Sequence, residues 1–160
     1  MNLNYELGRS DYEALAEFRY QIRRFLHFSE NAARAAGLEP QHHQLMLALR
    51  AVAGRRGARI VDLAERLQIQ HHSTVELIDR LEERALIRRS RGIDDRREVY
   101  VSLTPRGENV LQELTLHHRQ ELRTAAPALI AALRRIAGPV QRTGSKRNLS
   151  RQRVATKERA

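Results

Sequence analysis

The sequence predicts a mainly α-helical fold with one small β-hairpin, and three observations lead to that prediction. Apolar residues recur at spacings of three and four along most of positions 10–136, as they do on the buried face of a helix. The stretch from Ile87 to Leu103 instead carries β-branched and aromatic residues in partial alternation with polar ones. Aromatic residues make up 4% of the chain, which argues against a sheet-rich fold.

The first predicted helix begins at Ser10 and ends at Gly37. Ser10 and Glu13 have the spacing of a capping box, in which each side chain satisfies a free amide of the first turn. At 1.5 Å per residue the helix is roughly 39 Å long, more than a compact core requires. It therefore either lies along its own domain or, as its length favours, packs on a partner chain.

The second predicted helix has Pro40 in its first turn, where the missing amide of proline costs no hydrogen bond. Its apolar residues, among them Leu45 and Leu49, predict a largely buried helix that ends at Gly54. The loop that follows contains Arg55, Arg56 and Arg59. Phosphate contact and simple solvation account for these arginines equally well.

Two short helices are predicted next, from Ile60 to Leu67 and from His71 to Ala85. Each has one apolar stripe, so the two can share a small core. The stripes are formed by Ile60, Leu63, Ala64 and Leu67 and by Thr74, Leu77, Ile78 and Leu81. Because only residues 68–70 connect them, the pair has the outline of a helix-turn-helix, and the outer face of the second helix is the candidate reader of DNA.

A hairpin follows, with strands at residues 87–90 and 98–103 and a turn that contains Gly92. Its turn region is rich in arginine, with Arg88, Arg89, Arg91, Arg96 and Arg97 against Asp94 and Asp95. A protruding ribbon of this composition suits a DNA groove flanked by phosphates. The hairpin and the helix pair together have the outline of a winged helix-turn-helix.

Two further helices are predicted after the hairpin. Thr104 and Pro105 are a cap and a first helical residue, and Pro127 is interpreted as the start of the last helix, which Gly138 ends. Residues 141–160 contain seven of the 29 basic residues and one of the 19 acidic ones. With few large apolar groups, this basic tail is predicted to be disordered.

The composition excludes several classes of protein. The chain has no cysteine, so neither a disulfide framework nor a thiol switch is available. It shows no signal peptide and no apolar run of the ~18 residues that a membrane span needs, so we expect no membrane partner and a cytoplasmic location. Nor does it show a phosphate loop, a nucleophile elbow or a zinc-protease motif, and we expect no enzymatic activity.

Several short motifs in the sequence resemble parts of one family signature. They are Leu67-x-Ile69, Asp79-Arg80-Leu81-Glu82, Leu86-Ile87-x-Arg89, Asp95-Arg96-Arg97 and Val101-x-Leu103-Thr104-x-x-Gly107. Their order and spacing resemble the signature of the MarR family of bacterial transcriptional regulators, over about residues 12–136. Two positions depart from it: Ala85 stands where the family often has a helix-ending glycine, and Gln70 where a Ser or Asp cap is usual.

The resemblance implies a homodimer in which the first helix and the last two helices of each chain intertwine. It also implies a repressor that binds a pseudo-palindromic operator and is released by a small effector. On this interpretation residues 1–53 hold a dimerisation helix and the second helix, and 54–104 the DNA-binding region. Residues 105–138 hold the C-terminal dimerisation helices, and 139–160 form the tail.

The candidate DNA-binding residues are His71, His72, Ser73, Val75, Glu76, Arg80, Arg89, Arg96 and Arg97. Arg97 is the strongest candidate, with Asp95 bracing it or the turn so that it reaches a narrow minor groove. Glu76 can accept from a cytosine amino group or pair with Arg80, and we favour the ion pair. Arg89 can contact DNA or, as the resemblance implies, hold the hairpin to the helix pair.

A small-molecule site is predicted between the dimerisation helices and the DNA-binding region. Its candidate lining residues are Phe25, Phe28, His43, Met46 and His118, although Phe25 and Met46 are individually better explained as core. An apolar wall with one or two imidazoles suits an aromatic acid or a phenol.

Two alternatives complete the sequence-based interpretation. His43 and His118, with Glu113 or Glu121, can be combined into a metal site, but the spacing is not that of a ligand motif, and we predict neither a metal nor a cofactor. The competing functional class is a nonspecific or architectural nucleic-acid-binding protein driven by the basic tail.

Overall fold

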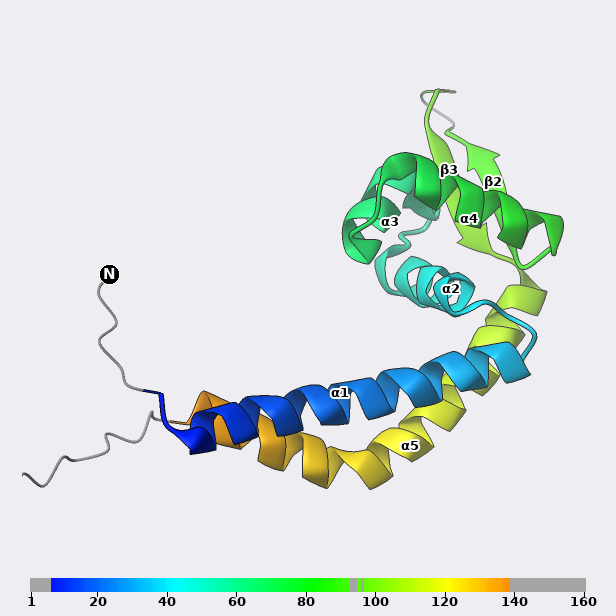
Figure 1. The fold of residues 1–160 in the computed structure, drawn as a ribbon. Helices are drawn as coiled ribbons and strands as arrows, with labels where there is room; N and C mark the ends of the chain where they lie inside the picture. The colour runs from blue at the N-terminus through cyan, green and yellow to red at the C-terminus, as the bar shows by residue number, and fades with distance from the viewer. Residues whose placement is uncertain (1–6, 93–94, 96, 139–160) are drawn as a thin grey trace, which may run out of the picture.

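The computed structural model describes residues 7–138 except 93, 94 and 96, so the predicted tail and Arg96 lie outside the described residues. The elements are α1 (Arg9–Ala35), α2 (Pro40–Val52), β1 (Ala58–Arg59), α3 (Ile60–Leu67), α4 (His71–Glu83), β2 (Ile87–Arg91), β3 (Val99–Leu103) and α5 (Pro105–Ala137). Figure 1 shows two parts: an arm in which α1 lies along α5, and a head formed by residues 40–103.

The core of the head is built around α2, which contacts α3, α4, β3 and α5. Leu45 and Leu49 of α2 are fully buried together with Leu63 of α3, Ile78 of α4 and Val101 of β3. One apolar residue from each surrounding element therefore meets the central helix, which fixes the positions of α3 and α4 relative to the hairpin.

The hairpin is present as predicted, with β2 and β3 antiparallel and Arg89 opposite Val101. The structure adds a third strand, β1, which pairs with the other edge of β3 and gives the sheet order β1-β3-β2. β1 has only two residues, too few for any alternation to be visible in the sequence.

The ends of α1 differ in how well they were predicted. The prediction that Ser10 caps the helix is wrong: Gly8 is the cap residue, and its amide donates to the Asp11 carboxylate at 2.8 Å. Asp11 thus takes the role expected of Glu13 two residues earlier, but glycine has no side chain to complete the capping box, and the Asp11 amide donates to the Gly8 carbonyl at 3.0 Å instead. At the other end α1 stops at Ala35, and Gly37 follows with φ +73°, a left-handed conformation that glycine adopts without strain.

The prediction of two helices after the hairpin is wrong. α5 is a single helix from Pro105 to Ala137 with Pro127 inside it. Proline lacks the amide that would bond to the preceding turn, but Ala125, Ala126 and Ala128 around it have the highest helix propensity. α5 packs against α1, and it has buried residues both before Pro127 (Leu114) and after it (Ala132), so packing can hold the helix together across the missing bond.

The arm exposes large apolar side chains that the chain itself does not cover. Besides Tyr20, they are Tyr12, Leu15, Ile22 and Leu26 on α1 and Leu116, Leu122, Ile130 and Leu133 on α5. Tyr12 is 62% exposed and Leu116 56%, although both belong to amphipathic helices. We call these eight residues, without Tyr20, the arm stripe. Within residues 7–138, leaving out the three gaps, no helix is both long and apolar enough to cross a membrane.

Candidate nucleic-acid interface

Helix α4 offers one face to solvent because its other face completes the core. Thr74, Leu77, Ile78 and Leu81 are buried, and the Thr74 hydroxyl donates to the Gln70 carbonyl at 3.1 Å. Of the residues predicted to read DNA, His71, His72, Glu76 and Arg80 are exposed, whereas Ser73 and Val75 are half-buried at the edges of the exposed face. Gln70 caps the helix with its backbone alone, as expected where Ser or Asp is missing.

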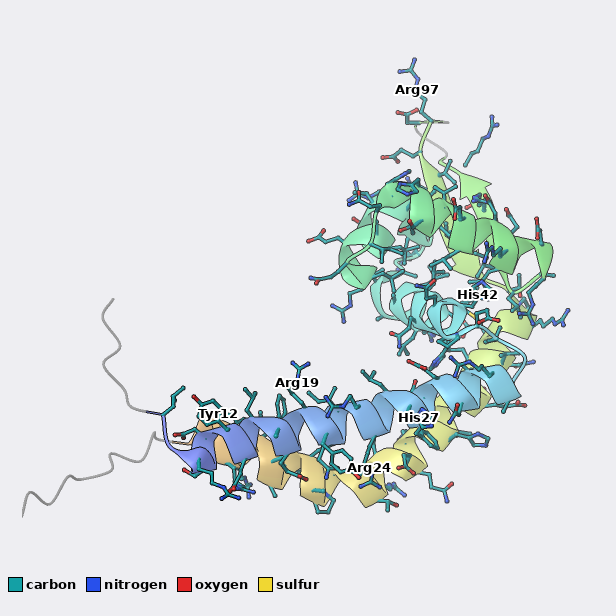
Figure 2. The ribbon with its side chains drawn as sticks, in the orientation of Figure 1. Tyr12, Arg19, Arg24, His27, His42 and Arg97 are labelled. Atoms are coloured by element: carbon teal, nitrogen blue, oxygen red, sulfur yellow. The ribbon has the colours of Figure 1, made fainter. Side chains whose placement is uncertain are left out.

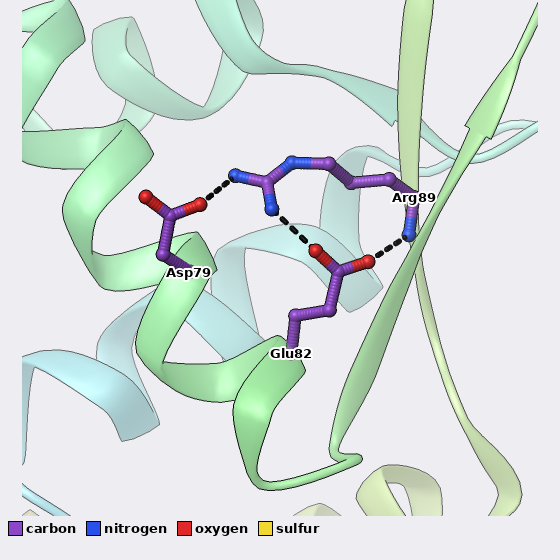
Figure 3. Close-up of polar contacts among 3 residues, drawn as sticks. All are labelled: Asp79, Glu82 and Arg89. Carbon is purple, nitrogen blue, oxygen red and sulfur yellow. Dashed lines mark hydrogen bonds and ion pairs between the residues drawn. The ribbon is translucent and has the colours of Figure 1, made fainter.

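Arg89 joins the hairpin to α4. Its guanidinium lies between the carboxylates of Asp79 and Glu82, and its backbone amide donates to Glu82 at 2.9 Å (Figure 3). Of the two roles considered for Arg89, this geometry corresponds to bracing, and a contact with DNA stays a prediction. The single positive charge of Arg89 also offsets one of the two negative charges of Asp79 and Glu82, which lowers the repulsion between this helix and DNA phosphates.

The favoured ion pair between Glu76 and Arg80 is absent. Both side chains are exposed, and in the part of the chain that the structure describes neither has an ion-pair partner. Neighbouring turns of an exposed helix gain only ~0.3–0.5 kcal/mol from such a pair, which is too little to order two long side chains. Glu76 therefore keeps an unpaired carboxylate on the exposed face.

The wing tip is organised by backbone contacts. Asp95 accepts a hydrogen bond from the amide of Arg97 at 2.8 Å, so it braces the turn rather than the guanidinium. A Cβ on Gly92 would lie 2.5 Å from the Asp95 carbonyl oxygen, so only glycine fits there. Figure 2 shows Arg97 at the outer end of the wing, directed away from the rest of the molecule. The braced turn thus leaves the Arg97 side chain exposed and available to a phosphate or a groove.

The end of the wing is tied to the start of α5. The Thr104 hydroxyl accepts from the Gly107 amide at 3.0 Å and donates to the Ala85 carbonyl at 2.7 Å. A Cβ on Gly107 would lie 2.0 Å from the carbonyl oxygen of Leu86. The Thr-x-x-Gly motif therefore fixes the start of α5 against the segment that follows α4.

The aromatic cluster predicted to hold an effector forms where α1, α2 and α5 meet. His118 lies 4.8 Å from His43, 5.5 Å from Phe28 and 6.0 Å from Phe25 between ring centroids. Its Nδ1 donates to the Leu114 carbonyl at 2.6 Å, and its Nε2 lies 2.8 Å from the Ser29 hydroxyl. Burial, with a smaller contribution from His118, lowers the pKa of His43 to about 4. Met46, the fifth predicted residue, is fully buried in the core.

An open groove lies beside this cluster. It has a volume of about 460 Å³ and is lined by Phe28, Asn31, Ala32 and Ala35 of α1 and by His117, Gln120, Glu121 and Thr124 of α5. Phe28 is the one predicted residue that lines it. His117 lines the groove, whereas His118 faces the aromatic cluster, because adjacent residues on a helix point about 100° apart. The predicted effector site stays a prediction.

Two features concern histidine more generally. His42 was missed: it is 4% exposed at the start of α2, and neither of its ring nitrogens has a hydrogen-bond partner among the residues that the structure describes. Its spacing in the apolar stripe of α2 was the only available signal. Across the described ranges, no three His, Asp or Glu side chains lie close enough together to hold a metal ion.

A short helix pair in which α4 exposes a polar face, followed by an antiparallel wing with an arginine at its tip, is a winged helix-turn-helix. Proteins of this class bind double-stranded DNA. The sequence model of the MarR family matches residues 36–98, from the end of α1 to the end of the wing turn. Over these residues the chain is similar to the MarR family of transcriptional regulators.

Solved structures share the fold beyond this segment. AbsC, a MarR family transcriptional regulator from Streptomyces coelicolor, is 23% identical with a TM-score of 0.67, covering 86% of this chain and 95% of that one. A variant of MepR from Staphylococcus aureus, bound to an oligodeoxyribonucleotide, is 20% identical with a TM-score of 0.60, covering 76% and 84%. BpsR from Bordetella bronchiseptica, whose DNA binding is regulated by 6-hydroxynicotinic acid, is 23% identical with a TM-score of 0.56, covering 74% and 93%. No protein of curated function matches the sequence.

Proposed function

We propose that the chain is a homodimeric repressor that acts in the cytoplasm, binds a pseudo-palindromic operator and is released by a small aromatic acid or phenol. The observation that carries the DNA-binding part is the pairing of an exposed helix face with an exposed Arg97, both held in one unit by Arg89. The start of α4 supplies His71, His72 and Ser73 as donors to base edges or phosphates. Arg97 supplies charge at the neighbouring groove.

The arm stripe supports the dimer. Eight large apolar side chains are exposed on two helices that pack together, more than the single scattered ones normal for a monomer. A two-fold axis through the arms would present two copies of α4 to one side of the DNA. The half-sites then have centres about 10 bp, or a multiple of that, apart.

The groove beside Phe28 supports the effector. Its volume of about 460 Å³ suits a small organic molecule, and it borders the joint of α1, α2 and α5. The Phe28 ring offers an apolar wall, while His117 and Gln120 offer donors to a carboxylate or phenolate. A ligand that favours the DNA-incompetent arrangement of the two heads by ~3 kcal/mol would weaken operator binding by roughly two orders of magnitude. BpsR, which shares the fold, responds to a molecule of this class.

The alternative is nonspecific binding driven by charge. The net charge of +10 and the basic residues after position 140 favour it. Removing residues 141–160 is expected to lower the affinity for all DNA similarly, because such contacts carry no sequence information.

A salt titration separates the two functions. Binding of the full chain to the DNA upstream of its own gene is compared with binding to a scrambled duplex of the same composition, from low to physiological salt. A repressor keeps a preference for the matched duplex after the electrostatic background has fallen, and an aromatic acid or phenol reduces that preference. Equal affinities at every salt concentration would contradict the proposal in favour of the alternative.

A further inference from the structure

Helix α4 carries four carboxylates, and the structure separates them by their surroundings. Asp79 and Glu82 are held by Arg89. Glu83 is the last residue of the helix. Glu76 lies at the centre of the exposed face, and among the described residues nothing forms a hydrogen bond or an ion pair with it. Glu76 is therefore the one central carboxylate of α4 whose acceptors are unused by the described residues.

A free carboxylate at this position opposes DNA binding unless a base satisfies it. When α4 enters the major groove, the Glu76 carboxylate loses bound water. It also comes close to phosphates, whose negative charge repels it. A donor on a base edge offsets that cost only where the sequence provides one. An unpaired carboxylate on the exposed face therefore lowers the affinity for most DNA sequences and leaves it high for the few that offer a donor. This difference in affinity is what produces specificity.

We propose that Glu76 reads cytosine, accepting a hydrogen bond from the N4 amino group in the major groove. This inference rests on the proposed operator binding. Guanine and thymine present acceptors at that edge, and adenine places its N7 acceptor beside its amino group, so both arrangements repel a carboxylate. Cytosine presents an amino donor and carries no acceptor of its own at that edge, so it is the base that suits a carboxylate best.

The surrounding contacts keep Glu76 directed outward. The buried side of α4, with Leu77 and Ile78, prevents the helix from turning about its axis, and the ion pairs of Arg89 with Asp79 and Glu82 hold its flank against the hairpin. Residues four apart share a helix face, so the exposed His72 lies beside Glu76 one turn nearer the start of the helix. Glu76 thus enters the groove in a fixed direction, next to a side chain that can also reach the DNA.

Selection from randomised DNA tests the inference for any operator sequence. Full-length wild-type protein, Glu76→Ala, Glu76→Gln and Glu83→Gln are each used to enrich duplexes from the same random pool, and the bound DNA is sequenced. Glu83→Gln is the matched control, because it removes the same charge from the same helix, seven residues further on. Glu76 and Glu83 are both exposed, so the substitutions should leave the fold intact, which equal melting temperatures verify.

The wild type is expected to select cytosine at one position in each half-site. Glu76→Ala should accept all four bases there, with discrimination lowered roughly 5- to 100-fold, and Glu76→Gln should shift the preference to adenine, which an amide contacts through N6 and N7. Glu83→Gln should keep the wild-type profile. A Glu76→Ala profile equal to that of the wild type at every position would overturn the inference alone. A wild-type protein that enriched no sequence would overturn the proposed function as well.

Discussion

The least satisfied side chain in the described part of the head is His42. It is buried at the start of α2 without a hydrogen bond, and burial, followed by the nearby Arg84 and Arg80, lowers the pKa of its imidazole. A buried polar group without a partner costs ~1–3 kcal/mol. His42→Leu, of similar volume, is therefore expected to raise the free energy of unfolding by about 1–2 kcal/mol in urea denaturation, while the exposed control His117→Leu changes it little. A loss of stability in His42→Leu would mean that the ring has a partner in solution.

His43 makes the stability depend on pH. Its pKa of about 4 in the folded chain lies below the ordinary 6.5, so the unfolded chain binds a proton first as the pH falls. The contribution of His43 to the free energy of unfolding is therefore complete above pH 6.5, and it is lost as the pH falls from there toward 4. Between pH 7 and pH 5 this amounts to about 2 kcal/mol of unfolding free energy.

The measurement is urea denaturation of the wild type and His43→Gln at both pH values. The variant should lose about 2 kcal/mol less than the wild type between pH 7 and pH 5. The difference between the proteins cancels the titration of carboxylates common to both. Identical pH dependence in the two proteins would show that His43 titrates normally in the folded state.

At the scale of single elements, the end of α4 is strained. Ala85 has φ +55°, a left-handed conformation that costs a non-glycine residue about 1 kcal/mol or more. Ala85→Gly is expected to stabilise the protein by up to ~1 kcal/mol. The backbone strain that it relieves exceeds the free-energy cost of the extra conformational entropy that glycine gives to the unfolded chain. Ala51→Gly, in the exposed part of α2, should instead destabilise by ~0.5–1 kcal/mol. Thermal and urea unfolding of both variants check this, and the same sign for both would contradict it.

Most of the helices and strands could be predicted from the sequence. Side-chain periodicity and breakers such as Gly37 predicted α1 to α4 and the hairpin, because each of these has a buried stripe and local end signals. β1 was missed because its two residues are defined by pairing with β3, which is a contact between distant positions. The continuity of α5 through Pro127 was missed for a similar reason: the local rule predicts a break, and packing against α1 overrides it.

The candidate site shows the same division. Arg97 and Asp95 could be named as candidates because the composition of the wing is visible in the sequence, and a contact of Arg97 with DNA stays a prediction. The bracing of Arg89 could only be stated as one of two roles, because it depends on the distance from β2 to α4. The isolation of Glu76 and the lack of partners around His42 depend on three-dimensional packing and gave no local signal.

At the scale of the whole molecule, the arm stripe predicts a dimer. Ile130→Glu combined with Leu133→Glu places two charges in the proposed interface, where burial without a partner costs several kcal/mol. Light scattering should give twice the chain mass of 18.5 kDa for the wild type and the chain mass for the variant. Val61→Glu, exposed on α3 in the head, is the control and should remain dimeric. A monomeric wild type at micromolar concentration would contradict the dimer.

The central claim is that the head and its wing bind DNA as one unit, and the most direct test is the effect of Arg97 on operator binding. Affinity for the upstream duplex is measured by gel shift at physiological salt for the wild type, Arg97→Ala and Arg119→Ala, the last on α5 in the arm. Arg97→Ala should weaken binding by ~1–3 kcal/mol with unchanged folding, because the side chain is exposed at the wing tip, and Arg119→Ala should bind as the wild type does. Wild-type affinity in Arg97→Ala, or an equal loss in both variants, would contradict the account.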